Sequence, residues 1–267
     1  MTRLCRRYGV TRSGYYAWRR RPSSAHAEQD RQLLTQIRRI FQAHAGRYGS
    51  PRVHRALTTA GVQVSRRRVA RLMRAAGLRA KAVRGYRAKA GVHRFYARQP
   101  NRLRGLRVSG PNQVWVGDIT YLPVAGRWWY LAVVMDQYSR RVLAWSLTPR
   151  RDATVTCAVL RAAARARRAQ GVIFHSDRGS EYLAAPFHAC VRALGLLQSA
   201  STRGPGDNAH MESFFHSLKA ELTRGVQFRS ARVLRRELRR YIRYYNQVRM
   251  HSALAYHSPI AFEARAA

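Results

Sequence analysis

Apolar residues in the first third of the chain recur every three to four positions, the spacing that places them on one face of an α-helix. The first predicted helix covers residues 28–43, and its apolar positions are Leu33, Leu34, Ile37, Ile40 and Phe41. A second helix is predicted over residues 51–60, because Ser50 is a favourable N-cap and Pro51 suits the first helical turn. Gly61 ends this second helix.

A third helix is predicted from Ser65, its N-cap, to Ala76, and its polar face is strongly basic. Two short helices joined by a turn, the second loaded with arginine at its start, are typical of a helix-turn-helix, here over about residues 50–77. A basic helical bundle that grips only phosphates is the alternative. We expect DNA contacts, mostly with the phosphate backbone, from Arg66, Arg67, Arg68 and Arg71.

After residue 112 the pattern changes to short alternating or continuous apolar runs, which are typical of β-strands. Three strands are predicted at residues 113–121, 127–136 and 140–147, and the first two form a hairpin. The following elements are a helix at 152–168, a strand at 171–174, a helix at 184–194, a strand at 196–199 and a helix that begins at Asp207. This order predicts an α/β fold with a mixed sheet.

Charge divides the chain at about the same place. The 267 residues contain 51 Lys and Arg but only 12 Asp and Glu, so the formal net charge of +39 indicates a polyanionic partner, double-stranded DNA. No acid lies between Asp30 and Asp118, an interval that holds 21 Lys and Arg. The predicted organisation is a basic helical DNA-binding region at 1–85, a basic linker at 86–112, a catalytic core at 113–225 and a C-terminal helical extension at 226–267.

Three features favour a cytoplasmic protein. No apolar run reaches the roughly 18 residues of a membrane span, and the basic N-terminus lacks the apolar stretch of a signal peptide. The three cysteines, Cys5, Cys157 and Cys190, form no CxxC motif, so neither a disulfide scaffold nor a structural zinc site is expected.

Three of the few carboxylates occupy positions suited to metal chemistry. Asp118 lies within the first predicted strand, Asp177 follows the fourth strand, where open α/β sheets bind ligands, and Glu212 lies in the last core helix. If the three converge, their oxygen atoms suit Mg²⁺ or Mn²⁺, and two such ions can hold the attacking and leaving oxygens of a phosphodiester. The alternative is that each is a surface acid or an ion-pair partner.

Other polar side chains near these acids are accessory candidates. Glu212, His216 and Lys219 stand at i, i+4 and i+7, so one helix face would carry all three, with Lys219 about 10.5 Å along the axis from Glu212. Lys219 would then contact the DNA backbone; a solvated surface lysine is the alternative. His175 either orients water or substrate or is a packed structural histidine, and Asp207 is interpreted as the N-cap of the helix.

Four blocks in the second half of the chain resemble, in order, the catalytic-core motifs of bacterial insertion-sequence transposases. They are QVWVGDITY (113–121), HSDRGSEY (175–182), DNAHMESFFHSLK (207–219) and YNQVRMHSALAYHSPIAFE (245–263). The front segments TRSGYYAW (11–18) and RYGSPRVHRAL (47–57) look like the second-reading-frame product of the same group. These enzymes form part of the DDE superfamily, to which retroviral integrases are related.

The resemblance implies a ribonuclease-H-like, mixed five-stranded sheet behind a helix-turn-helix-like region. It implies that Asp118, Asp177 and Glu212 are the catalytic, metal-binding triad, with two Mg²⁺ or Mn²⁺ ions. It further implies cleavage at transposon ends and strand transfer into target DNA by a homo-oligomer in a synaptic complex, alone or with an upstream-frame partner or fusion. One departure is visible: the family usually has 35 residues between its second aspartate and its glutamate, and this chain has 34, one fewer in the loop at 201–206.

Two other functions are compatible with the same three acids. A ribonuclease-H-like nuclease would cut DNA without joining it, and an inactive remnant would only bind the ends of the element. A tyrosine recombinase is disfavoured, because the Arg and His arrangement of that class is not recognisable around Tyr121 or Tyr130.

Overall fold

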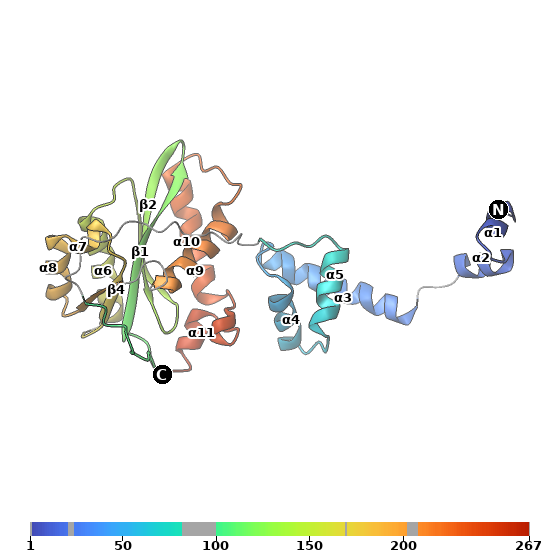
Figure 1. The fold of residues 1–267 in the computed structure, drawn as a ribbon, viewed down its shortest axis with the longest axis horizontal. Helices are drawn as coiled ribbons and strands as arrows, with labels where there is room; N and C mark the ends of the chain where they lie inside the picture. The colour runs from blue at the N-terminus through green and yellow to red at the C-terminus, as the bar shows by residue number, and fades with distance from the viewer. Residues whose placement is uncertain (1, 21–23, 82–99, 169, 202–207, 267) are drawn as a thin grey trace. The chain divides into compact units, whose positions relative to one another are not determined.

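Two compact units, Met1–Lys81 and Ala82–Ala267, make up the computed structural model of the chain. The structure describes every residue except 1, 21–23, 82–99, 169, 202–207 and 267 (Figure 1). About half of the predicted linker at 86–112 therefore lies outside the described residues, and the predicted domain boundaries stay predictions.

The first unit is helical. Helices α3, α4 and α5 pack against one another and bury apolar side chains that include Ile37, Leu57 and Val69. This packing confirms the prediction of a helix-turn-helix-like region. The helices of the unit are α1 (Thr2–Arg7), α2 (Arg12–Arg20), α3 (Ala25–Ala43), α4 (Ser50–Thr59) and α5 (Arg66–Ala75).

Helix starts in this unit show where side-chain capping decides the boundary. Ser65 caps α5 as predicted, since its hydroxyl accepts a hydrogen bond from the Arg68 amide at 3.2 Å. The prediction that Ser50 caps α4 is wrong: the helix already includes Ser50, and Gly49 is the cap. Pro51 remains in the first turn, where its missing N–H leaves no hydrogen bond unmade.

The second unit contains a five-stranded mixed sheet in the order β3-β2-β1-β4-β5. Strand β2 pairs antiparallel with both β1 and β3, β4 pairs parallel with β1, and β5 pairs parallel with β4. This arrangement confirms the predicted ribonuclease-H-like fold. The strands are β1 (Val114–Val124), β2 (Arg127–Asp136), β3 (Val142–Thr148), β4 (Ile173–Ser176) and β5 (Leu197–Ala200).

Helices cover both faces of the sheet (Figure 1). One apolar core joins the sheet to α9 and α10, and a second joins its other face to α6 and α8. The sheet is therefore a central layer, and its buried strands read as nearly continuous apolar runs. The helices are α6 (Ala153–Arg167), α7 (Ser180–Leu183), α8 (Ala185–Ala193), α9 (Ala209–Leu218), α10 (Ala231–Gln247) and α11 (Pro259–Glu263), with a 3₁₀ turn at Ser252–Leu254.

The last core helix differs from the prediction at both ends. Asn208, not Asp207, is the N-cap residue of α9, and Asp207 lies outside the described residues together with most of the shortened loop at 201–206. The α-helix ends at Leu218, and a π-helical turn, Lys219–Thr223, follows it. Among the described helices, none combines the length and the apolar character that crossing a membrane requires.

Candidate active site

Asp118 lies on β1, the central strand of the sheet. The preceding residue must be glycine, because a Cβ on Gly117 would lie 2.3 Å from the ring of Phe174 on β4. This close approach of strand and ring fixes the backbone on which Asp118 is carried. The Asp118 carboxylate accepts a hydrogen bond from the Ile119 amide at 2.7 Å.

Asp177 follows directly after β4, the parallel neighbour of β1. In the register of the two strands, Gly117 pairs with Ser176, so Asp118 and Asp177 stand one position further along adjacent strands. The Asp177 carboxylate accepts a hydrogen bond from the Gly179 amide at 3.0 Å, which holds it in a turn. Burial raises the pKa of Asp118 to about 8, and the negative charge of Asp177 adds to this rise. The two acids that the sequence predicts as partners therefore lie near one another.

Asn208 ties the start of α9 to this strand. Its side-chain amide donates a hydrogen bond to the Gly117 carbonyl at 3.2 Å. Its side-chain oxygen is buried and has no hydrogen-bond partner among the described residues. Glu212 lies one helical turn further along α9 and is partly exposed. Among the described residues no group of three or more His, Cys, Asp and Glu is arranged to hold a metal, so the three-acid site stays a prediction.

Lys219 approaches the acids from the π-helical turn after α9. Its Nζ lies 4.8 Å from the ring centre of Tyr121, a cation–π contact with the strand that carries Asp118. Burial lowers the pKa of Lys219, while the negative charge of Asp118 opposes that shift. The lysine is thus half-buried beside the acid instead of solvated. The π-turn changes the straight helical geometry that the sequence predicts between Glu212 and Lys219.

An ion pair that the sequence patterns do not single out lies beside the same acids. Arg151 donates a hydrogen bond from Nε to a carboxylate oxygen of Glu181 at 3.0 Å, its Nη2 lies 3.0 Å from the same oxygen, and Glu181 is buried. Burial alone would lower the pKa of Arg151, but the hydrogen bond and charge of Glu181 raise it, and Asp177 and Asp118 add to the rise. The guanidinium therefore lies in the field of the two acids.

The only local signal for this pair is that Glu181 follows Asp177 by four residues within one of the recognised blocks. Arg151 comes 30 positions earlier, immediately before the N-cap of α6. No periodicity connects residues so far apart along the chain, and only the folded sheet brings them together.

The two histidine candidates differ in position. His175 is buried in β4, and its Nδ1 forms a hydrogen bond of 2.9 Å with the Ser199 hydroxyl on β5. This contact favours the structural interpretation of His175. His216 is partly buried on α9, four residues after Glu212. The assignment of either histidine as an accessory group stays a prediction.

A buried ion pair fixes the helical side of the site. Arg249 donates from Nη2 to Glu221 at 2.7 Å and to the Ser217 hydroxyl at 3.2 Å, and Tyr241 donates to Glu221 at 3.1 Å. Arg249 and Glu221 are both buried. The network thus ties the π-helical turn, which carries Lys219, to α10 and the segment after it.

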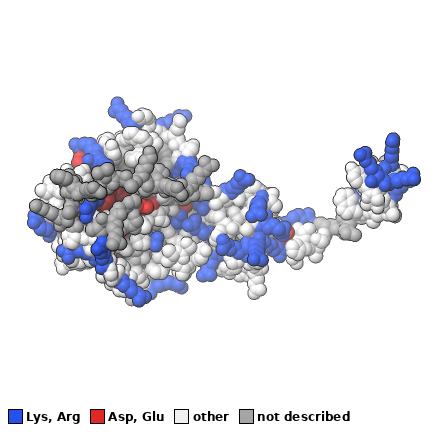
Figure 2. Space-filling view, viewed as in Figure 1, with Lys and Arg blue, Asp and Glu red and all other residues white. Residues whose placement is uncertain are grey.

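Two of the four arginines predicted to bind DNA in the first unit are already paired. Arg68 and Arg71 contact the two carboxylate oxygens of Asp30 at 2.7 and 2.5 Å. Arg66 and Arg67 are exposed at the start of α5, and no carboxylate of the described residues pairs with them. Figure 2 shows Lys and Arg side chains on both units and few acidic side chains on the same face.

Comparison with known families agrees with the fold. Residues 108–205 and 212–266 each match an Integrase core domain family, and residues 28–86 match the HTH-like domain family. The second unit therefore contains an integrase-type core domain. One chain of the cryo-EM structure of the simian T-cell lymphotropic virus intasome in complex with PP2A regulatory subunit B56 gamma has the same fold, with a TM-score of 0.51 and 16% identity. The match covers 85% of this chain and 74% of that one.

Sequence matches to two transposases extend over nearly the whole of this chain. The transposase for insertion sequence element IS904 of Lactococcus lactis subsp. lactis (strain IL1403) is 38% identical over 255 residues, which cover 91% of this chain and 98% of the relative. The transposase InsF for insertion sequence IS3A of Escherichia coli (strain K12) is 40% identical over 270 residues, which cover 97% and 92%. The chain belongs to the insertion-sequence transposase family.

Proposed function

We propose that this chain catalyses the two DNA steps of transposition, cleavage at the ends of an insertion sequence and transfer of the freed strand into a target. The observation that carries the proposal is the placement of Asp118 and Asp177 on adjacent parallel strands, close enough that the charge of one raises the pKa of the other. Two acids held together in this way need a cation to be charged at the same time.

The donor set fits a hard divalent ion. Asp118 and Asp177 provide carboxylate oxygens, and Glu212 would complete the triad from α9. The side-chain oxygen of Asn208 is buried, has no hydrogen-bond partner among the described residues and adds a further polar atom next to β1. Mg²⁺ or Mn²⁺, as two ions, would neutralise charge on the phosphodiester and lower the pKa of a bound water.

The residues of the chain position the DNA around these acids. Lys219 and Arg151 present positive charge near Asp118 from two different elements, and each would hold a phosphate oxygen of the reacting strand. The nucleophiles in this reaction are water and a 3′-hydroxyl, so no side chain forms a covalent bond to DNA.

The helix-turn-helix-like unit would bind the ends of the element. A homo-oligomer would hold two ends at once, with or without the product of an upstream reading frame.

The test is a strand-transfer assay with Mg²⁺ on labelled element ends, comparing the wild type with Asp177→Asn. We expect joined products from the wild type and neither cleavage nor joining from the variant, while DNA binding stays nearly intact. Asp152→Asn, which removes a carboxylate from the same unit and leaves a good helix N-cap, is the control. Cleavage without joining by the wild type would assign a nuclease instead, and binding alone would assign an inactive remnant. Normal Mg²⁺-dependent cleavage by Asp177→Asn would remove Asp177 from the catalytic set.

A further inference from the structure

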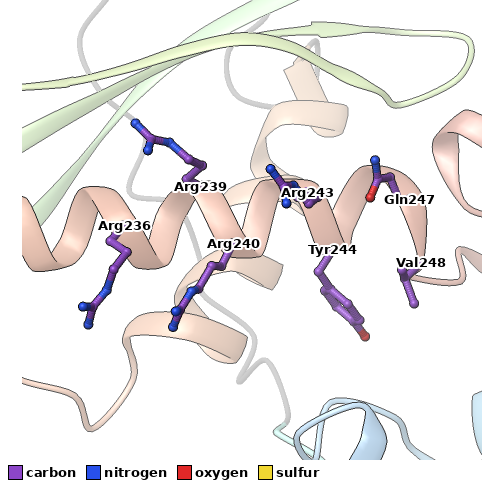
Figure 3. A pocket seen from close by; sticks show the side chains of 7 residues that line it. All are labelled: Arg236, Arg239, Arg240, Arg243, Tyr244, Gln247 and Val248. Atoms are coloured by element: carbon purple, nitrogen blue, oxygen red, sulfur yellow. The ribbon is translucent and has the colours of Figure 1, made fainter.

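Helix α10 carries a basic face that the catalytic site does not use. Arg236, Arg239, Arg240 and Arg243, here called the α10 arginine face, are all exposed. With Tyr244, Gln247 and Val248 they line a hollow of about 380 Å³ (Figure 3). In Figure 3 the side chains lie in two rows along the helix, which begin at Arg236 and Arg239 and end at Val248 and Gln247.

The opposite side of α10 holds this face in place. Leu234, Leu238 and Tyr241 are buried in the core that α10 shares with α9 and the sheet. Apolar residues at helical spacing therefore point α10 one way only, and the arginines cannot turn inward without unpacking that core. The packing of α10 therefore fixes the position of this surface, which presents its charges in two rows along the helix (Figure 3).

The charges on the α10 arginine face are mostly uncompensated. Glu237 pairs with Arg236 at 3.1 Å and with Arg240 at 3.4 Å, so one carboxylate serves two arginines. Within the described part of the chain, Arg239 and Arg243 have no carboxylate partner. Positive charges this close together repel one another, and a bound polyanion lowers that electrostatic repulsion. Arg235 is different, because it donates to the Leu147 carbonyl at 3.1 Å and serves the fold.

We propose that the α10 arginine face binds the phosphate backbone of a DNA duplex, separately from the helix-turn-helix-like unit. The face is extended, since Arg236 to Gln247 spans about 16.5 Å along the helix, and duplex DNA carries about one charge per 1.7 Å of its axis. The hydroxyl of Tyr244 and the amide of Gln247 are groups that also donate to phosphates. This assignment rests on the proposed function, in which one catalytic unit acts on two DNA segments and needs its own grip on DNA.

The test measures DNA affinity of the full chain at several salt concentrations, using a duplex without element ends. Arg239, Arg240 and Arg243 are changed together to Gln, which keeps helix propensity while removing three charges. The matched control changes Arg161, Arg165 and Arg192 to Gln, three exposed arginines on helices that cover the other face of the sheet. A third variant changes the same three α10 residues to Lys.

We expect the slope of log K against log salt to become shallower by about 2.7 in the α10 Gln variant, about 0.9 for each lost phosphate contact. The control should keep the wild-type slope, and the Lys variant should recover most of it. Equal losses in the α10 and control variants would mean that only total charge matters and would overturn the proposal, as would an unchanged slope. Because the assay reads binding alone, it decides this surface even if the wild type proves unable to join DNA.

Discussion

Asp30 in the first unit and Asp118 in the second are both acids in a chain with a large excess of arginine, yet their surroundings are opposite. Two guanidinium groups hold Asp30, and their hydrogen bonds, first from Arg71 and then from Arg68, lower its pKa. Asp118 is desolvated beside a second carboxylate, and its pKa is raised to about 8. The first unit neutralises its acid internally, whereas the second leaves its acids in need of a cation from outside. That difference supports the proposal that Asp118 binds a metal ion, whereas Asp30 links α3 to α5 through Arg68 and Arg71.

Lys219 offers the largest effect expected outside the acids themselves, because it lies half-buried beside Asp118. Lys219→Ala should lower the strand-transfer rate by about 10²-fold at saturating DNA and Mg²⁺, since small misplacement of a reacting group has costs of that order. Lys219→Arg should keep partial activity, because it keeps the charge in a planar, bulkier group. Overall DNA affinity should barely change in either variant, given 51 Lys and Arg in the chain.

Rates are measured by single-turnover joining with a pre-cleaved end. The control is Lys81→Ala, a lysine of the first unit. Wild-type joining by Lys219→Ala would mean that the contact with the Tyr121 ring serves only packing.

The second prediction follows from the raised pKa of Asp118 and concerns the thermal stability of the protein without divalent ions. A carboxyl whose folded pKa lies above its unfolded value stabilises the fold at low pH, and this contribution is lost as pH rises through the folded value. In a chelator, the melting temperature should therefore fall between about pH 4 and pH 8, and Mg²⁺ or Mn²⁺ should restore it at the upper end. Asp118→Asn should reduce the pH-dependent fall, part of which remains because burial also raises the pKa of Asp136, and should abolish the rescue.

Asp152→Asn is the matched control, because it removes an acid from the same unit and leaves a good helix N-cap. Melting is followed by circular dichroism across the pH series. A wild-type melting curve that does not respond to pH or to Mg²⁺ would argue against a metal at Asp118.

The sequence predicts the elements of the second unit better than it predicts their contacts. Strand β2 begins and ends at the predicted residues, because its apolar run is bounded by a turn at one end and Asp136 at the other. The adjacency of Asp118 and Asp177 follows from two neighbouring parallel strands, which the alternation of strand and helix already suggests. Local pattern is enough where the signal lies within a few residues.

Side-chain pairs between distant segments that do not lie on neighbouring strands are not visible in that pattern. The pair of Arg151 with Glu181 and the network around Arg249 join residues about 30 positions apart, and nothing in local spacing selects one arginine among many. The π-helical turn that begins at Lys219 is likewise hidden, because the residues around it have ordinary helical character. An arginine-rich composition thus hides which of its members are paired.

The smallest expected effect belongs to Asp30, and it tests whether Arg68 and Arg71 are structural or DNA contacts. Asp30→Asn removes the charge that holds both arginines, so they become available to phosphates. We expect tighter DNA binding, with the slope of log K against log salt steeper by up to about 1.8, or about 0.9 for each released arginine. At pH values above about 4, the substitution should lower the melting temperature of the first unit slightly. A carboxyl whose pKa is lowered in the folded state stabilises the fold at pH values above its pKa in the unfolded chain, and the variant lacks this contribution. The matched control is Glu28→Gln, which removes the same charge from the same helix, where Glu28 pairs with Arg31, and leaves the contacts of Asp30 in place. If both variants bind DNA alike, Arg68 and Arg71 serve the fold of the unit, and Arg66 and Arg67 at the start of α5 remain its predicted DNA contacts.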